Sequence, residues 1–226
     1  MKCLIMAGGF GTRLYPLTRY KAKALLEYEG KPLATYLVDQ IPDNMDIMVT
    51  INARFVDEFI NWQQSLDRKV ELCVEEASHE EKKMGAVNSI HFWVNSKAIE
   101  DDLLIVAGDN YFGFDLRHFI AAYNGENALV AVNDIGDKEK ASQFGVVRLK
   151  GNRIVGFDEK PSIAGSSLIS TACYLLPPRI FPMLGQLCST TLQDNLGNLI
   201  AYLIARDQVY AYIFNESWFD IGSENR

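Results

Sequence analysis

The fold of this chain is decided by residues 6–18, which read MAGGFGTRLYPLT. An apolar run over residues 2–7 leads into the glycines and is typical of a buried β-strand. Glycine has no Cβ atom, so the backbone N–H groups of the turn can approach an anion closely. Arg13 and Lys23 add positive charge beside those donors. A strand that runs into such a turn predicts a binding site for a polyphosphate.

Two well-known phosphate loops do not fit this stretch. A dinucleotide fingerprint requires a third glycine, and Leu14 stands at the matching position. A P-loop ends in Gly-Lys-Ser/Thr, whereas Gly30-Lys31 is followed by Pro32. Both motifs are therefore excluded.

Residues 8–18 resemble the signature of the sugar-phosphate nucleotidylyltransferases, which reads roughly G-G-x-G-T-R-L-x-P-L-T. In that family a lysine and a K-P-L/M segment follow, and Lys23 and residues 31–33 stand at those places. The resemblance implies transfer of a nucleoside monophosphate from a nucleoside triphosphate to a sugar 1-phosphate. The motif spelling is closest to members that use glucose 1-phosphate with dTTP or UTP. The resemblance also implies a nucleotide-binding set: Ala7, Gly8, Gly9, Gly11, Thr12 and Gly85.

The rest of the chain predicts an α/β fold. Apolar strand-like runs at 46–51, 70–74, 103–107 and 129–132 alternate with helical patterns at 33–41, 56–66, 86–94 and 116–123. This rhythm predicts a Rossmann-like, mostly parallel sheet with helices on both faces, which suits the nucleotide-diphospho-sugar transferase type. After Gly145 shorter strands follow at 146–149, 153–157, 169–175 and 209–214, with helices at 178–187 and 199–205. We expect one domain over 1–226, with a nucleotide-binding half (1–135) and a sugar-phosphate-binding half (136–226).

Composition excludes several classes of protein. The net charge of −7 argues against a generic nucleic-acid or anionic-membrane binder. The four cysteines are scattered, three of them among apolar residues, which indicates reduced thiols. No signal-peptide layout and no run of ~20 apolar residues is present. We expect a cytoplasmic protein that binds neither nucleic acid nor membrane. The sequence leaves open whether it forms a homo-oligomer.

Two aspartates are candidate ligands for Mg²⁺. Asp109 follows the apolar strand at 103–107, and carboxylates at such strand ends suit a magnesium ion that bridges to phosphate. Residues 108–110 resemble the family's G-D-N segment, and residues 218–222 resemble its W-x-D-x-G segment. The resemblance makes Asp220 the second carboxylate on the same metal. Taken alone, Asp109 would more often lie in a turn, and Asp220 could cap a helix.

The sugar-phosphate site rests on the second half of the chain. Residues 159–161 resemble the family's E-K-P segment, which implies that Glu159 binds sugar hydroxyls and that Lys160 binds the sugar phosphate. Residues 144–147 resemble a Y/F-G-V-V segment, in which Gly145 would let the backbone lie against the sugar. Ala172 stands where the family usually has glycine, so we expect a tighter pocket there and leave the sugar open.

The base-reading segment is less well defined. Glu75 or Glu76 could accept a hydrogen bond from the base edge, and Gly85 could lie against the base. A charged stretch over 77–83 separates them, so the base stays open.

The resemblance also implies the roles of the cations. Arg13 would neutralise the leaving pyrophosphate, Lys23 the α-phosphate and Lys160 the incoming phosphate, with Mg²⁺ between Asp109 and Asp220. Three alternatives remain: a catalytically silent subunit of the same fold, a cytidylyltransferase that acts on phosphocholine or a similar phosphate, and a metal-dependent glycosyltransferase. The last would require a D-x-D-like pair, which residues 108–111 lack. Because the chain stops soon after Ser223, we do not expect the C-terminal β-helix of many relatives or acetyltransferase activity.

Overall fold

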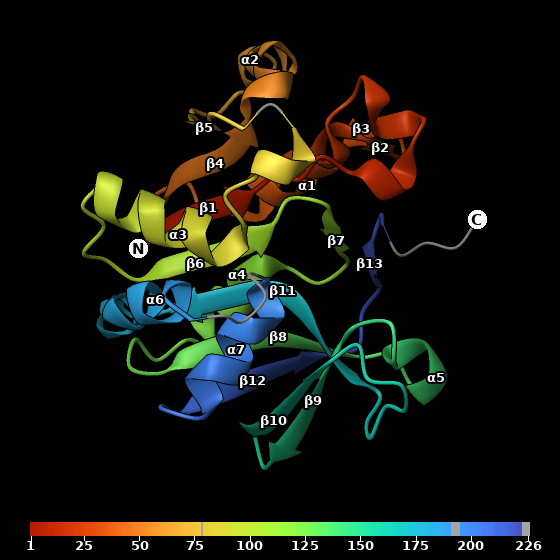
Figure 1. Ribbon diagram of the computed structural model, residues 1–226, viewed down its shortest axis with the longest axis vertical. Coiled ribbons are helices and arrows are strands. Elements are labelled where there is room, and N and C mark those ends of the chain that lie inside the picture. The colour runs from red at the N-terminus through yellow and green to blue at the C-terminus, as the bar shows by residue number, and fades with distance from the viewer. Residues whose placement is uncertain (78, 191–194, 223–226) are drawn as a thin grey trace.

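A central sheet organises the computed structural model, which describes residues 1–77, 79–190 and 195–222 (Figure 1). In this part of the chain nine strands form one sheet in the order β5-β4-β1-β6-β11-β8-β12-β10-β9. The bounds of these strands, in chain order, are β1 (Lys2–Met6), β4 (Asp46–Asn52), β5 (Glu71–Glu75), β6 (Leu103–Ala107), β8 (Ala128–Asp134), β9 (Gly145–Lys150), β10 (Arg153–Glu159), β11 (Leu168–Leu176) and β12 (Val209–Phe214).

β1 lies inside the parallel part of the sheet. It pairs with β4 on one side and with β6 on the other, both in parallel, and β5 extends the sheet beyond β4. Cys3, Leu4 and Ile5 are fully buried because both faces of the strand are covered, which explains its continuous apolar sequence. The carboxyl ends of these four strands therefore meet at one edge, where residues 8–11, called the glycine stretch below, begin.

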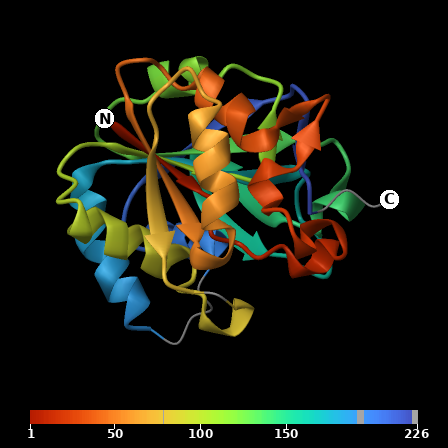
Figure 2. The ribbon, with the colours of Figure 1, turned by 90° about the horizontal axis from the view of Figure 1, so that it is seen from above.

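Helices cover both faces of the sheet, as predicted. One apolar core packs α1 (Leu33–Gln40), α2 (Val56–Gln64) and α4 (Leu116–Ala121) against the sheet. The other core packs α3 (Ala86–Ser96), α6 (Phe181–Cys188) and α7 (Leu196–Ile204). Figure 2 shows the arrangement from above. No helix in the described ranges is long and apolar enough to span a bilayer.

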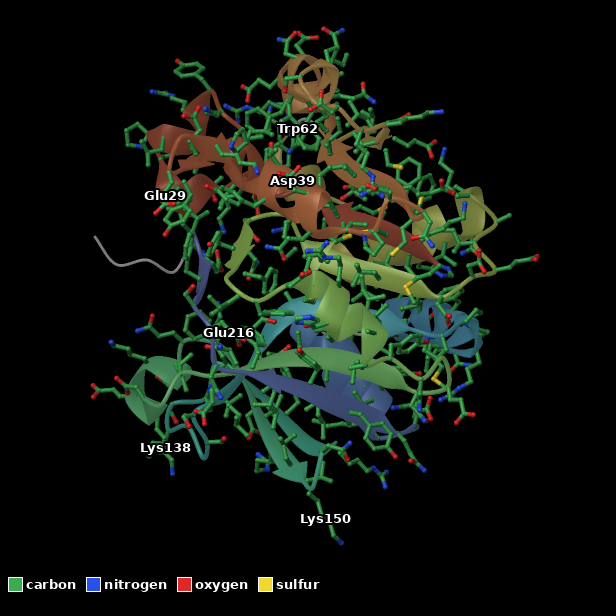
Figure 3. The ribbon with its side chains drawn as sticks, turned by 180° about the vertical axis from the view of Figure 1, so that it is seen from behind. Glu29, Asp39, Trp62, Lys138, Lys150 and Glu216 are labelled. Atoms are coloured by element: carbon green, nitrogen blue, oxygen red, sulfur yellow. The ribbon has the colours of Figure 1, made fainter. Side chains whose placement is uncertain are left out.

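The second half of the sheet is mixed. β11 runs antiparallel between β6 and β8, whereas β12 is parallel to β8. β9 and β10 form the predicted hairpin, and its turn places Gly151 at φ +62°, a conformation that favours glycine. Figure 3 shows Lys150 at the tip of this hairpin. The expected helix at 178–187 begins as a 3₁₀ turn (Pro178–Ile180) before α6.

Several short elements complete the fold. β2 (Glu27–Tyr28) pairs with β3 (Lys31–Pro32), and β7 (Asn110–Phe112) pairs with β13 (Trp218–Asp220). Asp220 lies in β13, so the alternative considered for it, a helix cap, is excluded. The helix cap considered at residues 194–195 falls on Asn195, whose Oδ1 accepts from the N–H of Asn198 at 2.7 Å, while Asp194 lies outside the described residues.

Candidate active site

A cavity of about 440 Å³ opens at the carboxyl edge of the parallel strands. Its lining draws on both halves of the chain. The predicted site residues that line it are Gly8, Gly9, Arg13, Gly85, Asp109, Gly145, Glu159, Lys160 and Asp220. Those that do not are Ala7, Gly11, Thr12 and Lys23. Ala7 is buried, and its N–H donates to Thr50 O at 2.9 Å.

The glycine stretch leaves β1 and turns sharply at Gly11. Gly11 has φ +62°, and a Cβ atom there would lie 2.9 Å from Thr18 Cγ2, so the turn requires glycine. A 3₁₀ turn over Thr12–Leu14 follows and carries Arg13. In the described part of the chain, the backbone N–H groups of residues 8–11 donate to no protein acceptor. Of these residues Gly8 and Gly9 line the cavity, and adjacent free donors of this kind can bind an anion there.

The two predicted metal carboxylates meet at one point. Lys23 Nζ lies 2.5 Å from Asp109 Oδ2 and 2.8 Å from Asp220 Oδ1, although 197 residues separate Lys23 from Asp220. Burial lowers the pKa of the Lys23 ammonium, but the two adjacent carboxylates outweigh this effect and raise its pKa overall. Asp109 and Asp220 therefore form a preformed binding site for a cation.

The β7–β13 ladder holds this pair of carboxylates together. Asp220 pairs in register with Asn110, and Trp218 Nε1 donates to Asn110 Oδ1 at 2.8 Å. Asn110 Nδ2 in turn donates to Asp109 Oδ1 at 2.9 Å. The ring of Tyr111 stacks on that of Phe219, with centroids 5.1 Å apart.

The donor set fits a divalent cation such as Mg²⁺. Both ligands are hard carboxylate oxygens that already converge on a single positive charge. Among the described residues, no cluster of three or more His, Cys, Asp or Glu forms a closed protein cage. Mg²⁺ is commonly bound by one or two carboxylates, with water and phosphate oxygens as its other ligands. Asp109 and Asp220 would supply the two carboxylates.

The predicted sugar side faces the glycine stretch across the cavity. Glu159 and Gly145 are register partners at the ends of β10 and β9. A Cβ atom at Gly145 would lie 2.3 Å from Phe157 Cζ, so packing of the Phe157 ring already requires glycine there. A Cβ atom at Gly197 would lie 2.2 Å from Glu159 Oε2, which places this carboxylate against the start of α7.

Ala172 lines the cavity in a strained backbone conformation. Its φ is +54°, within the irregular pairing of β11 between Ser170 and Tyr174. Alanine disfavours this region, whereas glycine adopts it freely. Ala172, which stands where the family usually has glycine, therefore adds a methyl group at a position whose backbone conformation favours glycine.

Of the two glutamates predicted to face the base, only one lies at the cavity. Glu75 is 6% exposed, lines the cavity and accepts a hydrogen bond from Ser89 Oγ. Glu76 is exposed and does not line it. Alternation along β5 predicts this outcome, because Cys73 and Glu75 share the inward face. Gly85, at φ +92°, begins α3 beside Glu75.

Some lining residues escaped the sequence reasoning. Lys83, Tyr174, Asn195 and Gly197 line the cavity. Lys83 lies in the charged stretch that offered no periodicity, and it pairs with Glu80. In the part of the chain that is described, neither Arg13 nor Lys160 forms a salt bridge, so both cations are available to a bound anion.

Comparison with known proteins points to one family. A model of the family described as nucleotidyl transferase matches residues 2–225. The chain is 28% identical to a putative mannose-1-phosphate guanyltransferase of Sulfolobus acidocaldarius, over 98% of this chain and 60% of that protein. It is 29% identical to the UTP–glucose-1-phosphate uridylyltransferase AglF of Haloferax volcanii, over 80% of this chain and 74% of that protein. The chain spans 51–60% of the length of four curated relatives that it matches.

A solved structure shares the fold. A putative glucose-1-phosphate thymidylyltransferase from Bacillus anthracis, in complex with a sucrose, superposes with a TM-score of 0.86 at 23% identity. The superposition covers 99% of this chain and 91% of that one.

Proposed function

The chain belongs to the nucleotidyl transferase family, and we propose that it transfers a nucleoside monophosphate from a nucleoside triphosphate to a sugar 1-phosphate. A nucleotide sugar and pyrophosphate are the products. The observation that carries the proposal is the cavity itself, which gathers free loop donors, unpaired cations and the Asp109–Asp220 pair. These are the groups that phosphoryl transfer requires, because positioning and charge neutralisation dominate its catalysis.

Each group has one role in this mechanism. The N–H groups of the glycine stretch hold the triphosphate, and Arg13 neutralises the pyrophosphate as it leaves. Lys160 holds the sugar phosphate so that its oxygen attacks the α-phosphorus in line with the leaving group. The bond from the α-phosphorus to the bridging oxygen then breaks, and the electron pair departs with pyrophosphate. Lys23 neutralises the α-phosphate.

The metal and the remaining contacts complete the assignment. Asp109 and Asp220 would hold Mg²⁺, which supplies Lewis-acid neutralisation of phosphate oxygens when bound. Glu75 and Gly85 would face the base, and Gly145 and Glu159 the sugar. The chain would thus divide into a nucleotide-binding half (1–135) and a sugar-phosphate-binding half (136–226) of one domain.

For the substrates, we propose glucose 1-phosphate with dTTP or UTP. The Bacillus protein and the Haloferax protein support this choice, because their names state glucose 1-phosphate as the substrate. The Sulfolobus relative favours mannose 1-phosphate with GTP as the second candidate. A silent subunit is disfavoured because Arg13, Lys23, Asp109, Lys160 and Asp220 are all present.

A substrate grid tests the proposal. Pyrophosphate release is measured with Mg²⁺ for dTTP, UTP, CTP, GTP and ATP against glucose, mannose and N-acetylglucosamine 1-phosphates. We expect strong release with glucose 1-phosphate and either dTTP or UTP, lost in Arg13→Ala and retained in Arg153→Ala, an exposed arginine on β10. If no combination in the grid releases pyrophosphate, and phosphocholine as acceptor gives none either, the proposal is overturned in favour of a non-catalytic subunit.

A further inference from the structure

In the glycine stretch, residues 8–11, two carbonyl groups accept hydrogen bonds from the protein, whereas the N–H groups donate none within the described part of the chain. The N–H groups of residues 8–11 have no acceptor in the described part of the chain. Two of the carbonyl groups, by contrast, are bonded: Gly8 O accepts from Asn52 Nδ2 at 3.2 Å, and Gly11 O accepts from Thr18 Oγ1 at 2.6 Å. Gly11 O also accepts from the N–H of Leu14 at 2.9 Å.

The two side chains that bind these carbonyl groups are themselves deeply buried. Asn52 is 1% exposed and Thr18 is 0% exposed. Buried polar side chains of this kind are retained only where they are hydrogen-bonded, because an unpaired one costs its full desolvation free energy. Asn52 is further fixed because its Oδ1 accepts from the N–H of Arg54 at 3.1 Å. Neither residue lines the cavity.

These two hydrogen bonds keep the carbonyl oxygens of Gly8 and Gly11 turned toward the protein, which favours anion binding by the stretch. A glycine peptide rotates easily, and a carbonyl oxygen turned toward the cavity would repel a phosphate. Asn52 holds the first carbonyl group of the turn, and Thr18 holds the last. With both oxygens bound from the protein side, the N–H groups between them stay free for an anion.

We propose that Asn52 and Thr18 are positioning residues, which clamp the glycine stretch at its two ends and pre-organise it as a receptor for the polyphosphate of the nucleotide. The inference rests on the proposed function, since it assigns the nucleotide to this stretch. The clamp touches no substrate and acts only through the orientation of Gly8 and Gly11. Its predicted effect is therefore on polyphosphate affinity and not on the sugar phosphate.

Binding of inorganic tripolyphosphate, measured by calorimetry, tests the clamp without any contribution from base or sugar. Thr18→Val removes the hydroxyl donor at nearly constant volume, and Asn52→Ala removes the amide. We expect each to weaken tripolyphosphate binding about tenfold, the size of one net hydrogen bond in a buried setting. Thr18→Ser keeps the hydroxyl and should stay within about twofold of the unmodified chain.

A matched control separates clamping from general destabilisation. Thr35→Val removes a threonine hydroxyl that accepts from Trp62 Nε1 at 2.8 Å, away from the cavity. This variant should lose stability and keep its tripolyphosphate affinity. In steady-state kinetics, Thr18→Val should raise KM for the nucleotide and leave KM for the sugar phosphate unchanged.

The outcomes distinguish the clamp from the function on which it rests. If the unmodified chain binds no tripolyphosphate and is silent in the substrate grid, the proposed function fails. If it binds tripolyphosphate and Thr18→Val and Asn52→Ala bind it equally well, the clamp is wrong while the function stands. Should both variants fail to fold, hydrogen–deuterium exchange of the unmodified chain decides. The amides of Gly8 and Gly9, which line the cavity, must exchange rapidly and slow on addition of tripolyphosphate, and slow exchange of both in the free chain would overturn the inference.

Discussion

At the scale of single residues, Lys23 has two competing partners. Its ammonium group occupies the point on which Asp109 and Asp220 converge, and the proposed mechanism requires it at the α-phosphate. A divalent cation and this ammonium cannot share one position between two carboxylates. In the proposed mechanism, binding of the metal would therefore be coupled to release of Lys23 toward the phosphate.

The first prediction follows from this competition. Lys23→Met removes the competing cation, so it should tighten Mn²⁺ binding in the absence of nucleotide by about tenfold, equivalent to ~1.4 kcal/mol. Electron paramagnetic resonance of free Mn²⁺ measures the affinity. Lys21→Met is the matched control, because within the described residues Lys21 pairs only with exposed Glu27, at 2.9 Å. Equal or weaker Mn²⁺ binding by Lys23→Met would contradict the competition.

The raised pKa of Lys23 gives a second prediction, on stability against pH. The folded pKa lies above the unfolded value of about 10.4, so the charged lysine stabilises the fold fully at lower pH. That contribution is lost as the pH rises through the folded pKa. Denaturant unfolding at pH 8 and pH 11 should therefore show that the stability difference between the unmodified chain and Lys23→Met shrinks at the higher pH. A difference that stays constant or grows would count against the ion pair.

The position of a residue at the end of an apolar strand could be predicted from the sequence, while its role stays a prediction. Gly8 and Gly9 follow one apolar strand and Asp109 follows another, and all three line one cavity. Glu75 and Glu76 could not be told apart until the face of β5 was known. Gly145 lines the cavity and also packs against Phe157, a contact between two strands that no local pattern reveals.

At the scale of elements, Arg68 joins the end of one helix to a distant turn. Its guanidinium donates to the carbonyls of Ile41, Pro42 and Met45, the last at 2.7 Å, just after α1 ends. Arg68 Nη1 also donates to Val38 O in the last turn of α1, at 3.4 Å, so Arg68 ties the helix terminus to the turn that follows it.

The third prediction tests these hydrogen bonds. Arg68→Ala should lower the free energy of unfolding by about 2–3 kcal/mol, because several partly buried carbonyl groups lose a charged donor. The free energy of unfolding of Arg68→Lys should lie between those of the unmodified chain and Arg68→Ala, since lysine keeps the charge but cannot match the donor geometry of the guanidinium group. Urea titration measures both. Arg153→Ala, an exposed site, should stay within about 0.5 kcal/mol of the unmodified chain. A loss for Arg68→Ala as small as that would show these hydrogen bonds to be unimportant.

The β7–β13 ladder carries the fourth prediction. Trp218→Phe removes the indole N–H that donates to Asn110 and so loosens the orientation of Asp109. We expect about fivefold weaker Mn²⁺ binding in the presence of nucleotide, since one net hydrogen bond contributes about 1 kcal/mol. Trp93→Phe is the control, because the Trp93 indole N–H has no hydrogen-bond partner in the described structure. If both variants bind Mn²⁺ alike, the ladder does not orient the metal carboxylates.

Long elements were predictable, and short ones were not. The helices at 33–40 and 86–96 follow apolar stripes of helical period, and the strands at 46–52 and 103–107 follow apolar runs. β2, β3, β7 and β13 contain two or three residues each, too few for any period to emerge. Their existence depends on pairing with a distant segment.

At the scale of the whole molecule, the sheet order explains why the site unites both halves. β11 enters between β6 and β8 in the antiparallel direction, so strands of the second half lie beside the parallel strands of the first. Figure 3 shows Glu216 on the segment that leads back toward the first half, where β13 delivers Asp220 to Asp109. The sequence rhythm predicted helices on both faces, but strand order depends on packing between distant segments and could not be read from it.

Transfer of a nucleoside monophosphate onto a sugar 1-phosphate can be followed by ³¹P nuclear magnetic resonance of the reaction mixture. With glucose 1-phosphate, Mg²⁺ and dTTP or UTP, we expect equal amounts of pyrophosphate and a new diphosphate diester. Asp109→Asn should abolish both signals, and Asp101→Asn, at an exposed position, should retain them. Inorganic phosphate without a diester would instead show hydrolysis, and an unchanged spectrum across all nucleotides and sugar phosphates of the grid would show that the chain does not catalyse this transfer.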